Sequence, residues 1–218
     1  MMNAMEHTVH KLIIVPCHAS FKSDTYIPLP EDIENDDYWA LQPFQKGEPP
    51  FYLEHIREGV KLTDDESLLV FSGGRTREES GRIWSESKTY DEIAKTLPNY
   101  VDERAELEEY ARDSFQNLDF SIRKFKHLFG HEPDMIYVIG WKFKEKRFQF
   151  HADTLQIRNA SFKYVGVNNP RPEDLAGALI GEEKTLKSFM ENPHGDEGVL
   201  LEKRLLRDPW QDGSPDNY

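Results

Sequence analysis

The sequence is short of cysteine, of long apolar runs and of positive charge. Its single cysteine, Cys17, cannot form a disulfide within the chain, which agrees with a reducing compartment. Its apolar runs, such as residues 12–15 and 68–71, are far shorter than the roughly 20 residues of a membrane-spanning helix. Lys and Arg total 27 against 40 Asp and Glu, and the net charge of -13 repels nucleic-acid backbones and anionic lipid headgroups. We therefore expect neither a membrane span nor a nucleic-acid partner.

Common catalytic and metal-binding motifs are also missing. The 8 histidines are scattered, without a His-Glu-x-x-His or paired-cysteine pattern, so we expect no transition-metal site. The chain has no Gly-x-Ser-x-Gly elbow of a hydrolase, no Walker loop and no Gly-x-Gly-x-x-Gly fingerprint. Residues 1–10 lack the basic start and apolar stretch of a secretory signal. We expect the protein in the cytoplasm or the nucleus.

The residues that are present suffice for one domain with a core of its own. Hydrophobic residues make up 38% of the 218 positions and aromatics 12%, while 31% are charged, which indicates a heavily solvated surface. We expect a flexible N-terminus over residues 1–9, an α/β domain over residues 10–191 and a C-terminal extension over residues 192–218. The polar, proline-rich stretch 17–50 is too long for an ordinary connection, and the last residues are expected to be loosely packed.

Short runs of β-branched residues alternate along the chain with segments whose apolar residues recur every three or four positions. This pattern is expected for buried parallel strands joined by helices. The expected strands are residues 11–16, 67–71, 135–139 and 162–167, with a short one at 100–101. The expected helices are residues 51–62, 85–97, 107–129 closed by Gly130, 144–158, and 172 to about 190. This order predicts a three-layer α/β/α sandwich with a mainly parallel Rossmann-like sheet.

The loop after the second strand is the first candidate ligand site, because open parallel sheets bind ligands beyond the carboxyl ends of their strands. Gly73 and Gly74 directly follow Ser72, so that backbone N–H groups can turn toward an anion. Arg75 and Arg77, with Thr76 between them, would add donors for phosphate or carboxylate oxygens. A tight turn with solvated arginines is the competing interpretation.

Three further groups could complete that site. Ser85 and Glu86 open the next expected helix, where they either cap it or contact a ligand. A polar cluster on one face of the third helix needs partners, which are either backbone groups near a helix start or a ligand. That cluster consists of Asp113, Ser114 and Asn117.

A basic run, which includes Lys146 and Arg147, lies where cations oppose the dipole of a helix start. The run indicates either an anionic ligand bound there or a helix start whose cations are solvated. His18 follows the first strand, where its imidazole is either an acid or base or is bonded to structural backbone. Cys17 is expected to be a buried structural thiol, because no motif supplies an activating base. His18, Glu86 and Asp113 are the candidates for proton transfer.

Several of these segments, taken in order, carry a family resemblance. They are residues 17–19, 72–77, 85–87 with Tyr90, 111–117, and 146–148 with His151. Over roughly residues 10–190 they resemble the YdcF, SanA and ElyC-like family of uncharacterised Rossmann-like domains, most closely its fungal branch. The resemblance implies one polar pocket built by these loops. It also implies an adenosyl or nucleotide-like ligand, such as S-adenosylmethionine or a nucleotide, without an established reaction.

The leading hypothesis is an enzyme of transferase or hydrolase type that acts on a small anionic or nucleotide-like metabolite. The first alternative is a non-catalytic module that binds a nucleotide or an adenosyl compound. The second alternative is a scaffold whose polar cluster is purely structural. The sequence identifies no cofactor and predicts no oligomeric state.

Overall fold

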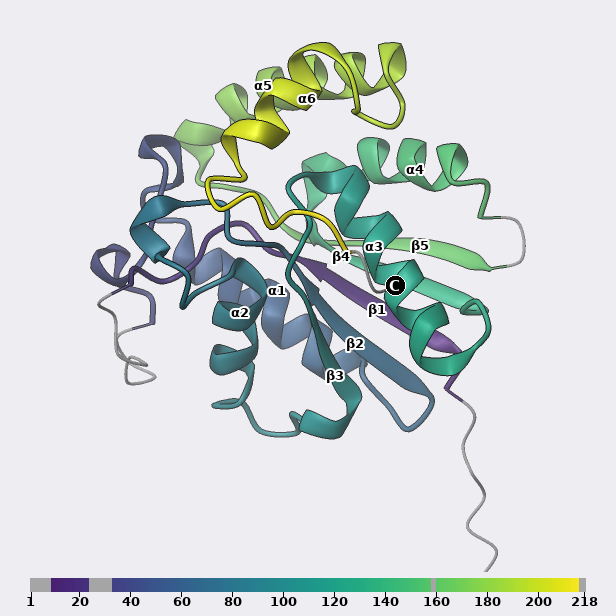
Figure 1. Cartoon of the computed structure of the whole chain (residues 1–218). Coiled ribbons are helices and arrows are strands. Elements are labelled where there is room, and N and C mark those ends of the chain that lie inside the picture. The colour runs from purple at the N-terminus through teal and green to yellow at the C-terminus, as the bar shows by residue number, and fades with distance from the viewer. Residues whose placement is uncertain (1–8, 24–32, 158–159, 216–218) are drawn as a thin grey trace, which may run out of the picture.

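A computed structural model describes residues 9–23, 33–157 and 160–215 of the chain (Figure 1). It confirms the three-layer α/β architecture, with one parallel sheet of five strands in the order β3-β2-β1-β4-β5. The strands are β1 Lys11–Pro16, β2 Ser67–Ser72, β3 Ala105–Glu108, β4 Met135–Trp141 and β5 Ser161–Asn168. The helices are α1 Pro49–Leu62, α2 Glu86–Ala94, α3 Ser114–Phe129, α4 Glu145–Thr154, α5 Pro172–Glu191 and α6 Gly198–Leu206.

The central strand β1 shows how the layers divide. Its six residues are almost wholly apolar, and their side chains point alternately to the two faces of the sheet. Ile13 and Val15 are fully buried in the core beneath α1 and α2, while Leu12 and Ile14 are fully buried beneath α3 and α4. Both faces are therefore covered by helices, which explains why this strand reads as a continuous apolar run.

The order of the strands places a switch point between β1 and β4. The chain passes from β1 outward to β2 and β3, and then crosses to the other side of β1 to form β4 and β5. The loops that leave β1 and β4 therefore diverge at the carboxyl edge of the sheet, beside the loop that leaves β2. That edge is where a sheet of this kind binds ligands.

Two sequence predictions about the middle of the chain were wrong. The third strand is Ala105–Glu108 and not residues 100–101, because Tyr100 donates its hydroxyl to Asp91 of α2 instead of joining the sheet. Helix α3 begins at Ser114 and not at 107, since Asp113 caps it by accepting from the Gln116 N–H. Its end was predicted correctly, because Gly130 takes the left-handed conformation, with φ of 75°.

The C-terminal extension packs on the domain. Phe189 of α5 and Leu200 of α6 are buried against Phe115 of α3. The segment after α6, yellow in Figure 1, then runs back across the loops at the start of α3. The expectation that the last residues are loosely packed is wrong for residues 208–215, which are anchored by Arg112 through Asp208 and Asp212.

Some expectations fall partly outside the described residues. The expected flexible N-terminus, residues 1–9, includes residues 1–8, and the proline-rich stretch includes residues 24–32, none of which the structure describes. Within the described ranges, no helix combines the length and apolar composition that crossing a bilayer requires.

Candidate functional site

Ser72, at the end of β2, is the centre of a buried hydrogen-bond network. Its hydroxyl donates to Oε2 of Glu108 at the end of β3, over 2.5 Å. Asn117 of α3 donates from Nδ2 to the Ser72 carbonyl and hydroxyl oxygens, both at 2.9 Å. Ser72 and Asn117, predicted to bind a ligand, therefore tie two strands and a helix together.

Gly73 and Gly74 do not present their N–H groups to a ligand. Gly73 donates to the Glu108 carbonyl at 2.9 Å and Gly74 to the Ala111 carbonyl at 3.0 Å. A Cβ at Gly74 would lie 1.6 Å from Nη1 of Arg112, so the missing side chain makes room for that arginine. The prediction that these N–H groups bind an anion is wrong, because neighbouring carbonyls already accept from both.

Glu108 is a buried carboxylate that sequence reasoning missed. It is 0% exposed, and its Oε1 accepts from the Tyr110 and Ala111 N–H groups, at 2.7 and 3.0 Å. Burial raises its pKa to about 7, although its hydrogen bonds, the first of them from Ser72, act in the opposite direction. The signal in the sequence was a glutamate at the end of a short strand, followed by the polar turn before α3.

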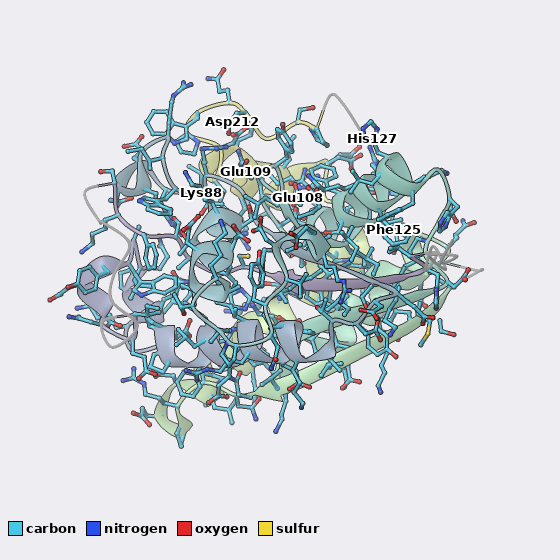
Figure 2. The ribbon with its side chains drawn as sticks, turned by 90° about the horizontal axis from the view of Figure 1, so that it is seen from below. Lys88, Glu108, Glu109, Phe125, His127 and Asp212 are labelled. Carbon is cyan, nitrogen blue, oxygen red and sulfur yellow. The ribbon has the colours of Figure 1, made fainter. Side chains whose placement is uncertain are left out.

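Arg75 and Arg112 are held by carboxylates of the same chain. Nη2 of Arg75 lies 2.9 Å from Glu109, and its Nη1 lies 3.6 Å from Asp212. Nη2 of Arg112 lies 2.9 Å from Asp208 and 2.5 Å from Asp212. Figure 2 shows Asp212, on the yellow C-terminal segment, next to Glu109. The chain therefore already supplies the anion that Arg75 was predicted to bind.

Ser85, Thr76 and Glu86 lie at the start of α2. Ser85 is the N-cap, with its hydroxyl accepting from the Lys88 N–H at 2.9 Å, as the capping interpretation predicted. Thr76 donates to Oε1 of Glu86 over 2.5 Å. Burial raises the pKa of Glu86, and the charges of Arg207 and Arg77 oppose this shift. Glu86 is the one of these three groups that faces the cations described below.

Asp113 and Ser114 are engaged at the start of α3. Oδ1 of Asp113 caps the helix at the Gln116 N–H, and its Oδ2 accepts from Arg204 of α6. The hydroxyl of Ser114 lies 2.8 Å from Nε2 of His151, and Arg147 donates to it over 2.8 Å. These contacts connect α3, α4 and α6, and they give no support to a role for Asp113 in proton transfer.

Arg147 and Lys146 occupy different environments on α4. Arg147 is paired with Glu182 of α5, with Nη2 2.7 Å from Oε2, and both side chains are largely buried. Lys146 is exposed. The ion pair between Arg147 and Glu182 connects α4 with α5 near the carboxyl edge of the sheet.

His18 follows β1 and lies in a cage of aromatic rings. Its Nδ1 is 2.8 Å from the Cys17 carbonyl, and its ring centroid is 5.3 Å from Tyr52 and 6.0 Å from Trp141. Burial lowers the pKa of His18 well below its usual value, and the charge of Lys144 adds to the effect. The imidazole is therefore neutral at pH 7. Cys17 is buried and its thiol donates to the Val15 carbonyl, so it is a structural thiol as predicted.

Four basic side chains are near enough to His18, to Glu86 or to one another for their charges to interact, and we call them the cationic cluster: Arg77, Lys144, Arg147 and Arg207. The charges of Arg147 and Arg207 act on Lys144, those of Arg77 and Arg147 act on Arg207, and those of Lys144 and Arg147 act on His18. The cluster thus joins the loops after β2 and β4 with the end of α6.

Three members of the cationic cluster have uncharged contacts. Arg77 donates to the side-chain oxygen of Gln42, Lys144 lies against the ring of Phe143, and Arg207 donates to the Arg112 carbonyl. In the described part of the chain, no carboxylate lies within ion-pair distance of these three cations. Burial lowers the pKa of Lys144 to about 8, and Arg147 adds to this shift. Carboxylates still act on two of these cations from further away: Glu182 and Glu48 act on Lys144, and Glu86 and Asp113 act on Arg207, whose side chain is exposed.

Other features add little to the site. A hollow of about 370 Å³ lies at the end of α4, away from the cluster, and is lined by Ala152, Asp153, Gln156 and Ile157. Among the described residues, no three His, Cys, Asp or Glu side chains are placed to hold a metal ion.

Sequence reasoning missed Lys144, Arg207 and His55. Lys144 belongs to the same basic run as Lys146 and Arg147, but only the structure shows which of these cations are partly buried. Arg207 belongs to the C-terminal extension, which no local pattern connects to the sheet. His55 is a polar residue on the buried face of α1, and this position was a usable signal.

The chain is similar to a known protein. The chain is 26% identical to the uncharacterised protein YOR238W of Saccharomyces cerevisiae, over 94% of this chain and 86% of that protein. No protein-family model matches the chain. No solved structure matches it either. The name of the yeast protein assigns no activity, so function has to be inferred from the geometry of the site.

Proposed function

We propose that the protein binds a small anionic metabolite at the cationic cluster and acts on it as a transferase or hydrolase. The observation that carries this proposal is a set of three cations without an ion-paired carboxylate, Arg77, Lys144 and Arg207, at the carboxyl edge of the sheet in a chain whose net charge is -13. In so acidic a chain, carboxylates are abundant, and cations without an ion-pair contact favour an anion from outside.

The reaction class follows from the neighbours of the cluster. His18 is neutral, and its Nδ1 is bonded to a carbonyl, so its Nε2 offers a bare lone pair that can accept a hydrogen bond from a reacting hydroxyl group. Glu86, with its raised pKa, is a second group for proton transfer. Group transfer to or from a phosphate-bearing or adenosyl-containing molecule uses such a base beside bound anionic oxygens. This proposal agrees with the ligand class that the YdcF-like resemblance implies.

The direct test is a thermal-shift screen with inorganic phosphate, pyrophosphate, nucleotides and S-adenosylmethionine. At about 100 times the dissociation constant, a ligand adds about 2.7 kcal/mol to the free energy of unfolding. For a chain of this length, the expected rise in Tm is about 5–10 °C. We expect Lys144→Met to reduce the affinity for the best ligand at least about tenfold, because a charge contact to an anion is lost.

Lys163→Met is the matched control for that variant. Lys163 lies near the start of β5, over the ring of Tyr137, at the opposite edge of the sheet. The same change there should leave the affinity as it is in the wild type. If both variants lose affinity equally, the binding reports only the overall charge of the protein, and the proposed site is wrong.

The affinity for the anion is expected to depend on pH through Lys144. With its pKa at about 8, the ammonium is charged below pH 8 and loses its proton above it. A bound anion favours the charged form of Lys144. The contribution of Lys144 to the affinity is therefore constant from pH 6 to 7.5, and it falls by up to tenfold for each pH unit above 8. Calorimetry at pH 8.5, in buffers of different ionisation enthalpy, should detect the uptake of a proton on binding.

Lys144→Arg is the control for this prediction. Its guanidinium stays charged across the whole range, so affinity should not change with pH and no proton should be taken up. If the arginine variant keeps the decline above pH 8, another group titrates and Lys144 is not in contact with the ligand.

A further inference from the structure

Two histidines beside the cationic cluster each have a buried ring nitrogen without a hydrogen-bond partner in the described part of the chain. These atoms are Nε2 of His18 and Nδ1 of His55. The two ring centroids are 5.5 Å apart, and the rings are perpendicular, at 89°. Trp141 lies against both, with its centroid 6.0 Å from His18 and 5.1 Å from His55.

The contacts of the other ring nitrogens determine where the hydrogens lie. The Cys17 carbonyl can only accept, so Nδ1 of His18 carries the hydrogen and Nε2 is bare. Nε2 of His55 lies 2.8 Å from Oδ1 of Asn168. The amide of Asn168 is oriented by its Nδ2, which donates to the Phe51 carbonyl at 3.1 Å. Nε2 of His55 therefore carries the hydrogen and its Nδ1 is bare.

Both bare nitrogens remain acceptors at neutral pH. Burial lowers the pKa of His55 to about 4 and that of His18 well below its usual value, and the charge of Lys144 adds to both shifts. The same charge repels an ammonium group, so a cationic amine is a poor partner for these nitrogens. Neutral hydroxyl groups are the donors that suit them.

We propose that the anion bound by the cationic cluster carries two hydroxyl groups, as a sugar or polyol phosphate does, and that these donate to His18 Nε2 and His55 Nδ1. This inference rests on the proposed function and names the substrate class of that site. Because both nitrogens are buried, binding of this kind requires the side chains around them to move. In such an enclosure a hydrogen bond discriminates strongly between a ligand that can donate and one that cannot.

The test compares two probes with the same three-carbon chain, glycerol 3-phosphate with two hydroxyls and n-propyl phosphate with none. Isothermal titration with the wild-type protein should show binding of glycerol 3-phosphate that is tighter by at least about tenfold. His18→Phe and His55→Phe keep a ring in place but remove the acceptor. In each variant the preference should fall to within about threefold, with the affinity for n-propyl phosphate unchanged. Lys144→Met should weaken both probes alike.

A second measurement does not depend on how the variants fold. The ¹⁵N side-chain resonances of His18 and His55 in the wild-type protein should show bare nitrogens at Nε2 and Nδ1. Both should shift upfield on addition of glycerol 3-phosphate and stay in place with n-propyl phosphate, because a nitrogen that accepts a hydrogen bond becomes more shielded.

The outcomes separate the two proposals. If the two probes bind equally, or if the preference survives in both phenylalanine variants, the inference is overturned and the anion site stands. If neither probe binds and the thermal-shift screen with phosphate, pyrophosphate, nucleotides and S-adenosylmethionine is also negative, the proposed function itself is overturned. Unmoved ¹⁵N resonances in a protein that binds glycerol 3-phosphate also overturn the inference.

Discussion

Replacing Arg112 by alanine is expected to lower the free energy of unfolding by about 3–5 kcal/mol, because it leaves buried groups without their partner. The Arg112 side chain is 2% exposed, and its Nη2 pairs with Asp208 and Asp212. Its Nη1 donates to the Tyr110 carbonyl at 2.9 Å. Denaturant unfolding followed by circular dichroism measures the loss. Hydrogen exchange should show that residues 208–215 become unprotected, since their anchor is gone.

Arg75→Ala is the control for that change. Arg75 contacts Asp212 as well, but it is more exposed, so its removal should cost about 1 kcal/mol or less. If Arg112→Ala costs no more than Arg75→Ala, the buried arginine does not hold the C-terminal segment on the domain.

Glu108→Ala is expected to cost about 3 kcal/mol of stability at pH 5, where the carboxyl is protonated and well bonded. The change leaves the Tyr110 and Ala111 N–H groups without an acceptor and the Ser72 hydroxyl without its partner. The two N–H groups are buried or partly buried in the loop between β3 and α3, and the Ser72 hydroxyl is buried at the end of β2. The loss should appear in urea unfolding as a lower midpoint with an unchanged slope.

Glu108→Gln separates shape from charge, because the amide keeps an acceptor for the two N–H groups. The pKa of Glu108 is about 7 in the folded protein, against an ordinary 4.5. The folded state therefore holds this proton more tightly, and the stability it contributes is fully present below pH 4.5 and is lost as pH rises through 7. The shift corresponds to about 3 kcal/mol.

Stability measured from pH 4.5 to 8 should accordingly fall in the wild type by more than in Glu108→Gln. At pH 8 the glutamine variant should be at least as stable as the wild type. If stability changes with pH in the same way in both proteins, ionisation of Glu108 does not lower the free energy of unfolding. Burial then does not raise the pKa of Glu108.

Much of the fold could be predicted, because the signals are local. The β-branched run Lys11–Pro16 and the glycine after α3 specify a buried strand and a helix end through residues that are adjacent in sequence. Strand β3 could not be found in this way. It has four residues, alternates Ala105 and Leu107 with glutamates, and is a strand because Ala105–Glu108 pairs with β2.

The sequence placed the candidate residues near the carboxyl ends of the strands, where the structure has them, but it did not predict their contacts. Arg75 and Arg77 look equivalent in sequence, with one residue between them. The two arginines differ in their contacts. Arg75 pairs with Glu109 and Asp212, while Arg77 contacts the uncharged side chain of Gln42. Such partners come from distant segments, and no local pattern encodes them.

The link between Arg112 and the C-terminal segment also bears on how the molecule is made. Arg112 and Asp208 are separated by 96 positions along the chain, so the ribosome must add nearly a hundred residues before the arginine finds its partner. Contacts this distant form late. In a nascent polypeptide, Arg112 in the turn that leads from β3 into α3 therefore lacks the carboxylates of Asp208 and Asp212 until residues 208–212 have been made.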